Sequence, residues 1–116
     1  MVISFAVDNA RNQLQTGGVV YTFRWKRRAF FKNEKGTIEQ TWYNEQRNRH
    51  SLGNVTIEEV CYISPTSNDM LEYLPLSGFD DQAEWYEAIM GNISPHRYPL
   101  YKMGWLYRVS LRGDST

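Results

Sequence analysis

The stretch of sequence that decides the fold lies near the N-terminus and reads GGVVYTFRWKRR, residues 17–28. Between its two glycines and its cluster of cations, apolar and polar residues alternate, as in a β-strand whose successive side chains point to opposite faces. One face is apolar and is expected to pack against the core: Val19, Tyr21, Phe23 and Trp25. The other face carries a hydroxyl group and two charges: Val20, Thr22, Arg24 and Lys26. The sequence therefore predicts a strand that buries one face and offers the polar side chains of the other for function.

Strands dominate the rest of the predicted structure. Apolar or alternating runs predict strands at 2–7, 19–25, 37–43, 55–63 and 105–111, with a further short strand at 29–32 and a turn at 33–36. Capping residues predict helices at 9–16 (after Asp8, closed by Gly17), at 66–73 (stopped by Pro75) and at 79–90 (closed by Gly91). Because strands and helices do not alternate, we predict an α+β fold in which a small mixed or antiparallel sheet curls into a β-barrel with short helices over its ends.

Length and composition indicate a single domain over residues 1–116. There is no long apolar run and no basic leader, so we expect a soluble, cytoplasmic protein that does not enter a membrane.

The one cysteine, Cys61, rules out an internal disulfide and is expected to be a buried, inert thiol. His50 and His96 lie in predicted loops without a partner at ligand spacing, so neither a metal nor another cofactor is expected. Nothing in the sequence indicates an oligomeric state.

Charge is distributed unevenly although Lys and Arg balance Asp and Glu at 13 each. Residues 24–50 hold eight cations and three anions, which gives this segment a charge of +5 and the remainder −5. Aromatic residues are interleaved with the cations, a combination typical of surfaces that bind RNA phosphates and stack bases. We expect phosphate contacts from Arg27, Arg28, Arg47 and Arg49 and a stacking surface from Trp25 or Trp42. The alternative is a solvated basic edge whose aromatic neighbours belong to the core. Residues 44–53, which are polar and basic, are a candidate ligand-contacting loop.

Two segments resemble the ASCH family, a branch of the PUA-like fold. Residues 17–24, GGVVYTFR, are similar to the family's first motif, and residues 77–85, SGFDDQAEW, to the segment that leads into its later helix. The resemblance implies a small curled β-barrel with a cleft beside the helices that binds RNA or nucleotides. It also implies a possible chemistry, because some members hydrolyse the acetyl amide of acetylated cytidine with a Lys and a Thr of the first motif and a Glu of the second.

The catalytic positions of that family are only partly present in this chain. Carried over one by one, the Thr is Thr22 and the motif's Arg is Arg24, but the Lys position is Val19 and the Glu position is Ser77. Neither valine nor serine can deprotonate a hydroxyl nucleophile, and Lys26 lies about 13 Å from Thr22 along the strand. The sequence therefore favours a non-catalytic module that binds RNA or a nucleotide in a basic cleft lined by Thr22, Arg24 and Lys26. Two alternatives stay open, an amidohydrolase with a rearranged catalytic set and a protein-interaction module that uses exposed aromatic side chains.

Overall fold

The computed structural model describes residues 2–28, 38–45, 49–91 and 103–112. Over these residues the chain forms five strands, two α-helices and two short 3-10 helices. Their order is β1 (Ile3–Ser4), α1 (Asp8–Gly17), β2 (Val19–Arg24), β3 (Ile38–Asn44), β4 (Gly53–Ile63), 3-10 helices at Asn68–Glu72 and Leu74–Leu76, α2 (Gln82–Met90) and β5 (Gly104–Leu111). The predicted α+β class is confirmed. The predicted strand at 29–32 and the turn at 33–36 lie outside the described residues.

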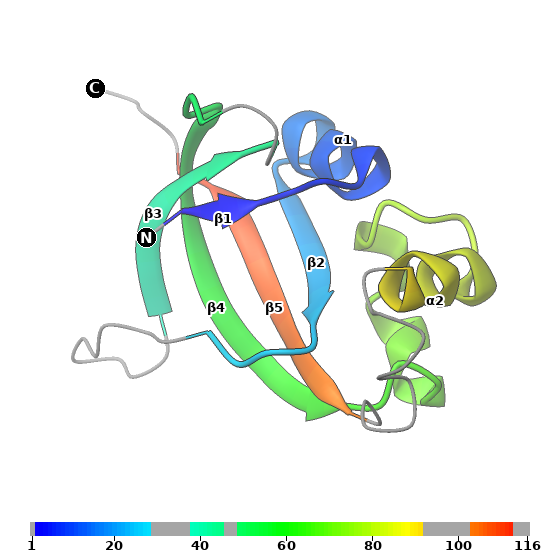
Figure 1. Cartoon of the computed structure of the whole chain (residues 1–116). Coiled ribbons are helices and arrows are strands. Elements are labelled where there is room, and N and C mark those ends of the chain that lie inside the picture. The colour runs from blue at the N-terminus through cyan, green and yellow to red at the C-terminus, as the bar shows by residue number, and fades with distance from the viewer. Residues whose placement is uncertain (1, 29–37, 46–48, 92–102, 113–116) are drawn as a thin grey trace.

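The five strands form one mixed sheet in the order β1-β3-β4-β5-β2, in which β1 pairs parallel with β3 and the other pairs are antiparallel. The long strand β4, which carries a bulge between Glu59 and Cys61, curls the sheet into a half-barrel (Figure 1). Strands β1 and β2 are its two edges and are not hydrogen-bonded to each other. We call the gap between them the seam. The helix α1 joins the two edge strands along the chain, at one end of the seam (Figure 1).

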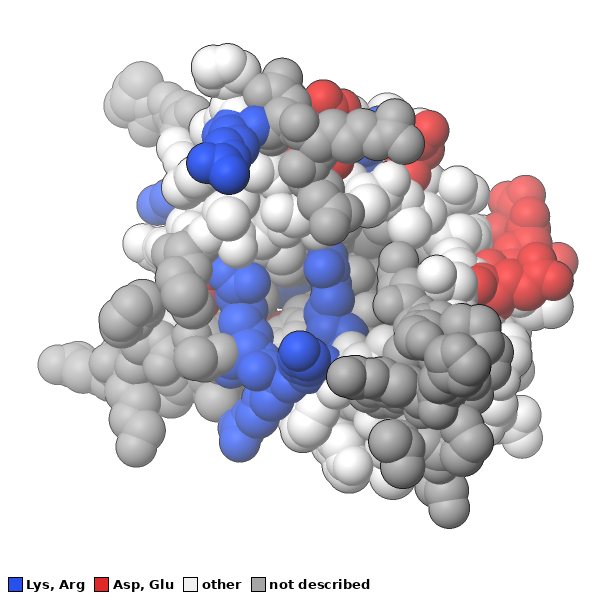
Figure 2. Space-filling model, viewed as in Figure 1, with Lys and Arg blue, Asp and Glu red and all other residues white. Residues whose placement is uncertain are grey.

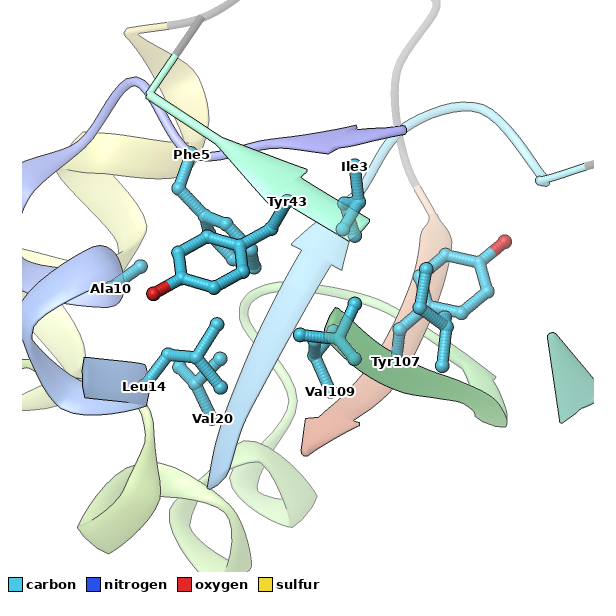
Figure 3. Packing of buried hydrophobic residues seen from close by; sticks show 10 residues of the cluster. Ile3, Phe5, Ala10, Leu14, Val20, Tyr43, Tyr107 and Val109 are labelled. Carbon is cyan, nitrogen blue, oxygen red and sulfur yellow. The ribbon is translucent and has the colours of Figure 1, made fainter. Parts of the chain in front are cut away.

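The interior of the half-barrel holds the larger of two apolar clusters (Figure 3). Ala10 and Leu14 of α1 point from the helix toward Val20 of β2 and the Tyr43 ring of β3, which packs edge-on against Phe5. The members of this cluster are Ile3, Phe5, Ala10, Leu14, Val20, Tyr43, Val55, Ile57, Tyr107 and Val109. Burial of these side chains supplies the main driving force that holds α1 against the curled sheet.

A second apolar cluster covers the outer face of β2 and β5, and it corrects one prediction. Phe23 and Leu106 pack there with Met70 of the first 3-10 helix and with Trp85 and Ile89 of α2. Tyr21 and Trp25 pack against the same cluster, so the apolar face of β2 points outward under the helices. The other face points into the half-barrel, where Val20 and Thr22 are buried. The prediction that β2 buries only its apolar face is therefore wrong, because both faces are covered.

Helix boundaries follow the predictions to within a few residues. Helix α1 extends through Gly17 and is closed by Gly18 instead of Gly17, since Gly18 takes the left-handed conformation (φ 79°) and its N–H donates to the Leu14 carbonyl. Helix α2 begins after Asp81, whose carboxylate accepts a hydrogen bond from the Glu84 N–H at 2.8 Å. The predicted helix at 66–73 is a 3-10 helix. Pro75 does not end that helix but lies within the first turn of the following 3-10 helix. No helix in the described parts of the chain has the length and apolar character needed to span a membrane.

Candidate functional site

A pocket of about 330 Å³ opens at the seam, between the two edge strands and α2. One wall is the connection from β1 to α1, the second is the end of β2, and the third comes from α2 and the segment before it. The lining residues are Ser4, Phe5, Ala6, Val7, Ala10, Thr22, Phe23, Arg24, Trp25, Phe79, Ala88 and Ile89. Its volume lies at the lower end of the range for small-molecule sites, so it suits one compact ligand or a single nucleotide unit.

Arg24 is the charged residue of the described pocket lining. Its Nη2 donates to the Ser4 carbonyl at 3.0 Å, and its guanidinium lies 5.2 Å from the centre of the Phe5 ring. Its Nε atom is buried and has no hydrogen-bond partner among the described residues. Burial lowers the pKa of Arg24 to about 10, and the nearby positive charge of Arg28 also lowers it. The group is therefore still charged at pH 7, in a place that disfavours charge.

Thr22 lies on the same inner face of β2, one strand repeat before Arg24, and is 8% exposed. It belongs to the pocket lining and carries a hydroxyl group. The described lining holds no Asp, Glu, His, Lys or Cys, so no general base for that hydroxyl is found there. Among the described residues, no group of three or more His, Cys, Asp or Glu side chains is arranged to hold a metal ion.

Trp25 forms the side of the pocket toward α2. Its indole N–H donates to the Ile89 carbonyl at 3.3 Å, and its ring packs edge-on against Phe23 with centroids 4.8 Å apart. These contacts fix the ring as a wall of the pocket. Trp42, the other predicted stacking residue, is half-buried on β3 and is not among the lining residues.

Two of the predicted phosphate contacts are engaged by carboxylates. Arg28 forms a two-point ion pair with Glu39 (Nε–Oε1 3.1 Å, Nη2–Oε2 2.8 Å), and the Arg28 and Glu39 side chains are only 15% and 4% exposed. Arg28 also bridges the seam, since its Nη2 donates to the Val2 carbonyl at 3.1 Å. Arg27 forms a similar pair with Glu59 at 2.8 and 3.0 Å, but its side chain is 57% exposed. The hydrogen bond to Glu59 raises the pKa of Arg27.

Of the remaining predicted cations, those that the structure describes are not among the pocket lining. Lys26 and Arg49 are exposed, and Arg47 lies outside the described residues, as does part of the candidate loop at 44–53. In Figure 2 the basic side chains of this face gather over the segment that follows β2, where they frame a hollow. The structure thus brings Thr22, Arg24 and Trp25 together, with Lys26 as the next exposed cation along the chain.

The segment 77–79 packs against the start of α1 and delivers Phe79 to the pocket. Ser77 is fully buried; its hydroxyl donates to the Leu74 carbonyl (2.8 Å) and accepts from the Phe79 N–H (3.1 Å). Gly78 has φ +91°, and a Cβ atom there would lie 2.3 Å from the Asn9 carbonyl oxygen. The two segments quoted from the sequence, 17–24 and 77–85, therefore meet at one pocket.

Sequence reasoning missed one whole wall of the pocket, residues 4–7. The apolar run at 2–7 predicts only a buried strand, and the signal in this wall is the polar residue Ser4. Ser4 interrupts the apolar run at the point where β1 ends and the chain continues toward the predicted helix at 9–16. Cys61 also departs from its prediction, because it is half-buried; burial raises the pKa of its thiol, against a smaller opposing effect of a hydrogen bond with Tyr73.

Comparisons of the chain with protein-family models, with curated proteins and with solved structures found no match. The function is therefore inferred from the pocket itself.

Proposed function

We propose that the chain is a non-catalytic binding module that takes one nucleotide, free or as part of single-stranded RNA, into the pocket at the seam. The observation that carries the proposal is Arg24. The buried Nε atom of this half-buried residue has no hydrogen-bond partner, and no carboxylate lies within 4 Å of its guanidinium among the described residues, which lowers the stability of the fold. A ligand that brings acceptor oxygens to this group would offset that loss.

The other walls suit a planar base. Phe79 and Trp25, which are both partly exposed, line the pocket with aromatic surface, and stacking on such side chains stabilises bound bases by about 1–3 kcal/mol each. Lys26, exposed directly after Trp25, is placed to contact a phosphate outside the pocket. The ASCH-like motifs support the same role, since the two segments that resemble that family both reach the pocket. We propose accordingly that the half-barrel is of the PUA-like type.

Binding is favoured over hydrolysis by the composition of the described pocket lining. Thr22 is the hydroxyl that the resemblance would make a nucleophile, and the described lining supplies no group to remove its proton. We expect no acetate release when the protein is incubated with acetylated cytidine. Release that is abolished by Thr22→Ala would replace the binding proposal with the hydrolase alternative.

The proposal is tested by titrating a fluorescently labelled single-stranded RNA across a salt series. Each phosphate contact to a single strand contributes about −0.7 to the log–log slope. Because Arg27 and Arg28 are engaged by Glu59 and Glu39, we expect two or three contacts and a slope of about −1.4 to −2.1. An absent or salt-independent response would contradict the proposal.

A matched pair of variants assigns the binding to the pocket. Arg24→Met removes the charge inside the pocket, and Arg27→Met removes an equal charge three residues away on the exposed surface. We expect Arg24→Met to weaken binding by at least about tenfold, because a hydrogen bond from a charged group is lost. Arg27→Met should weaken it by no more than about threefold. Equal losses would show that RNA binds the basic surface and not the pocket.

A further inference from the structure

The pocket lies along the free edge of β2, and this follows from which side chains line it. Thr22 and Arg24 belong to the inner face of the strand, whereas Phe23 and Trp25 belong to the outer face. A cavity that touches both faces of an edge strand must run along its edge. The backbone between these side chains, at Phe23, therefore faces the pocket.

The hydrogen-bond register shows that no described strand pairs with this edge at Phe23. Leu111 donates to the Gly18 carbonyl, and because Val20 lies opposite Val109 in the same register, the even residues of β2 are the ones that bond to β5. The odd residues then direct their N–H and C=O groups toward the seam, as the bond from Gln13 Nε2 to the Val19 carbonyl confirms for Val19. For Phe23, neither group has a hydrogen-bond partner among the described residues.

The opposite wall, formed by β1, also directs backbone hydrogen-bonding groups into the seam. The Phe5 N–H donates to the Asn44 carbonyl of β3, so the neighbouring Ser4 directs its backbone groups into the seam, where its carbonyl accepts from Arg24. Strands β1 and β2 are thus not joined by a ladder of backbone hydrogen bonds. Arginine side chains bridge the seam instead, and part of the edge of β2 stays open. The free edge at the pocket is a single residue long, too short to pair with an added peptide strand.

We propose that the unpaired backbone groups at the edge of β2 recognise the ligand by hydrogen bonding. The ligand is then a base with the hydrogen-bonding pattern of uracil. This inference rests on the proposed function. In order along the strand, the pocket offers a donor (Phe23 N–H), an acceptor (Phe23 C=O) and a second donor (the Arg24 guanidinium). The complementary ligand edge is acceptor, donor, acceptor. Uracil presents this pattern with its O4, N3–H and O2 atoms, whereas cytosine and guanine each place a donor where an acceptor is required.

The first experiment tests the open edge in the protein alone. Amide hydrogen exchange measured by NMR should show Thr22, which bonds to β5, exchanging more slowly than Phe23 by at least about tenfold. Equal protection of the two amides would overturn the inference, because the Phe23 N–H would then have a partner.

The second experiment tests the reading of the base with three probes: uridine 5′-monophosphate, 3-methyluridine 5′-monophosphate and cytidine 5′-monophosphate. We expect the uridine nucleotide to bind most tightly and to shift the Phe23 amide resonance. The methyl group removes the N3–H donor and collides with the Phe23 carbonyl, so the methylated nucleotide should bind at least about tenfold more weakly. Cytidine monophosphate should also bind more weakly, since it presents the wrong pattern.

The outcomes separate the two proposals. If all three nucleotides bind equally and Arg24→Met weakens all of them, the pocket binds nucleotides but the edge does not read the base, and the further inference is wrong. If none of the three binds and an extended peptide shifts the Tyr21 and Phe23 amides instead, both proposals are wrong and the seam is a peptide site. Preferential binding of uridine monophosphate with no shift at Phe23 would also overturn the inference.

Discussion

Two arginines of one segment, Arg24 and Arg28, bridge the same seam and differ in what surrounds them. Each donates through Nη2 to a backbone carbonyl on the β1 side, at 3.0 Å to Ser4 and at 3.1 Å to Val2. Arg28 in addition donates two hydrogen bonds to the carboxylate of Glu39, inside the half-barrel. Arg24 has an aromatic ring beside it, a pocket in front of it and a buried Nε atom without a described partner.

This difference shows how one end of the seam is closed by an ion pair while the other end stays open to a ligand. A buried ion pair that is fully hydrogen-bonded fixes its surroundings, and removing one partner leaves a buried charge behind. A buried guanidinium with unused hydrogen-bonding capacity contributes little to stability and is retained where a ligand completes it. We interpret the Arg28 end as structural and the Arg24 end as the binding end.

The largest effect is expected from breaking the Arg28 end. Glu39→Gln leaves the Arg28 guanidinium buried beside a neutral amide, so the free energy of unfolding should fall by about 3 kcal/mol or more. Urea denaturation followed by circular dichroism measures this loss. Glu59→Gln, which removes the carboxylate partner of exposed Arg27, is the control and should have a much smaller effect. Similar losses for the two variants would mean that the buried pair is no more structural than the exposed one.

A somewhat smaller loss is expected at the glycine that positions Phe79 beside the Arg24 end. Gly78→Ala places a methyl group in left-handed backbone against the carbonyl of Asn9, which should cost about 2 kcal/mol of stability. Because Phe79 then moves out of the pocket wall, nucleotide affinity should fall as well. Gly17→Ala is a suitable comparison, since the Cβ atom there would meet only the end of the flexible Gln13 side chain. An unchanged affinity for Gly78→Ala would separate Phe79 from the site.

A smaller change is expected from removing the unpartnered arginine. Arg24→Met relieves a buried charge and keeps much of the apolar volume, so the free energy of unfolding should change by less than about 1 kcal/mol in either direction. Arg28→Met should destabilise by about 3 kcal/mol or more, because it leaves the Glu39 carboxylate buried alone. Equal destabilisation by the two substitutions, measured by urea denaturation, would abolish the distinction between the two ends.

The smallest effect is a pH dependence of binding. With its pKa lowered to about 10, Arg24 loses its charge as the pH rises through that value, so affinity should fall about twofold at pH 10. Stability should move the other way: the pKa is lower in the folded than in the unfolded protein, so this group's unfavourable contribution diminishes above pH 10. Calorimetric titration with a nucleotide whose base does not ionise in this range provides the measurement, with Arg24→Met as the pH-insensitive reference.

Much of the fold could be predicted from local patterns in the sequence. The alternation in 19–25 and 105–111 placed β2 and β5, and Asp81 and Gly91 marked the ends of α2. The face of β2 that meets the half-barrel could not be predicted, because covering the apolar face requires 3-10 helices and an α-helix that lie more than forty residues further along the chain. Periodicity shows which residues share a face but not what packs against it.

The site could be predicted only in part for a similar reason. Thr22, Arg24 and Trp25 are close in sequence on one strand and one turn, so proximity along the chain brought them to one pocket. The ion pair of Arg28 with Glu39 depends on how the sheet curls, which no local pattern reports. Counting cations therefore overestimated the charge available for phosphates. Trp42 fell outside the pocket because β3 directs it away from the interior that holds Tyr43.

The central claim is that Arg24 is the arginine of the seam that a ligand completes. It is tested most directly by observing the side-chain Nε–H resonances of Arg24 and Arg28 in a ¹⁵N-labelled sample during titration with uridine 5′-monophosphate. We predict that the Arg24 Nε–H resonance shifts and exchanges more slowly with solvent on saturation, while the Arg28 resonance stays in place. A titration in which the Arg24 resonance does not move, or in which both resonances move together, would contradict the account.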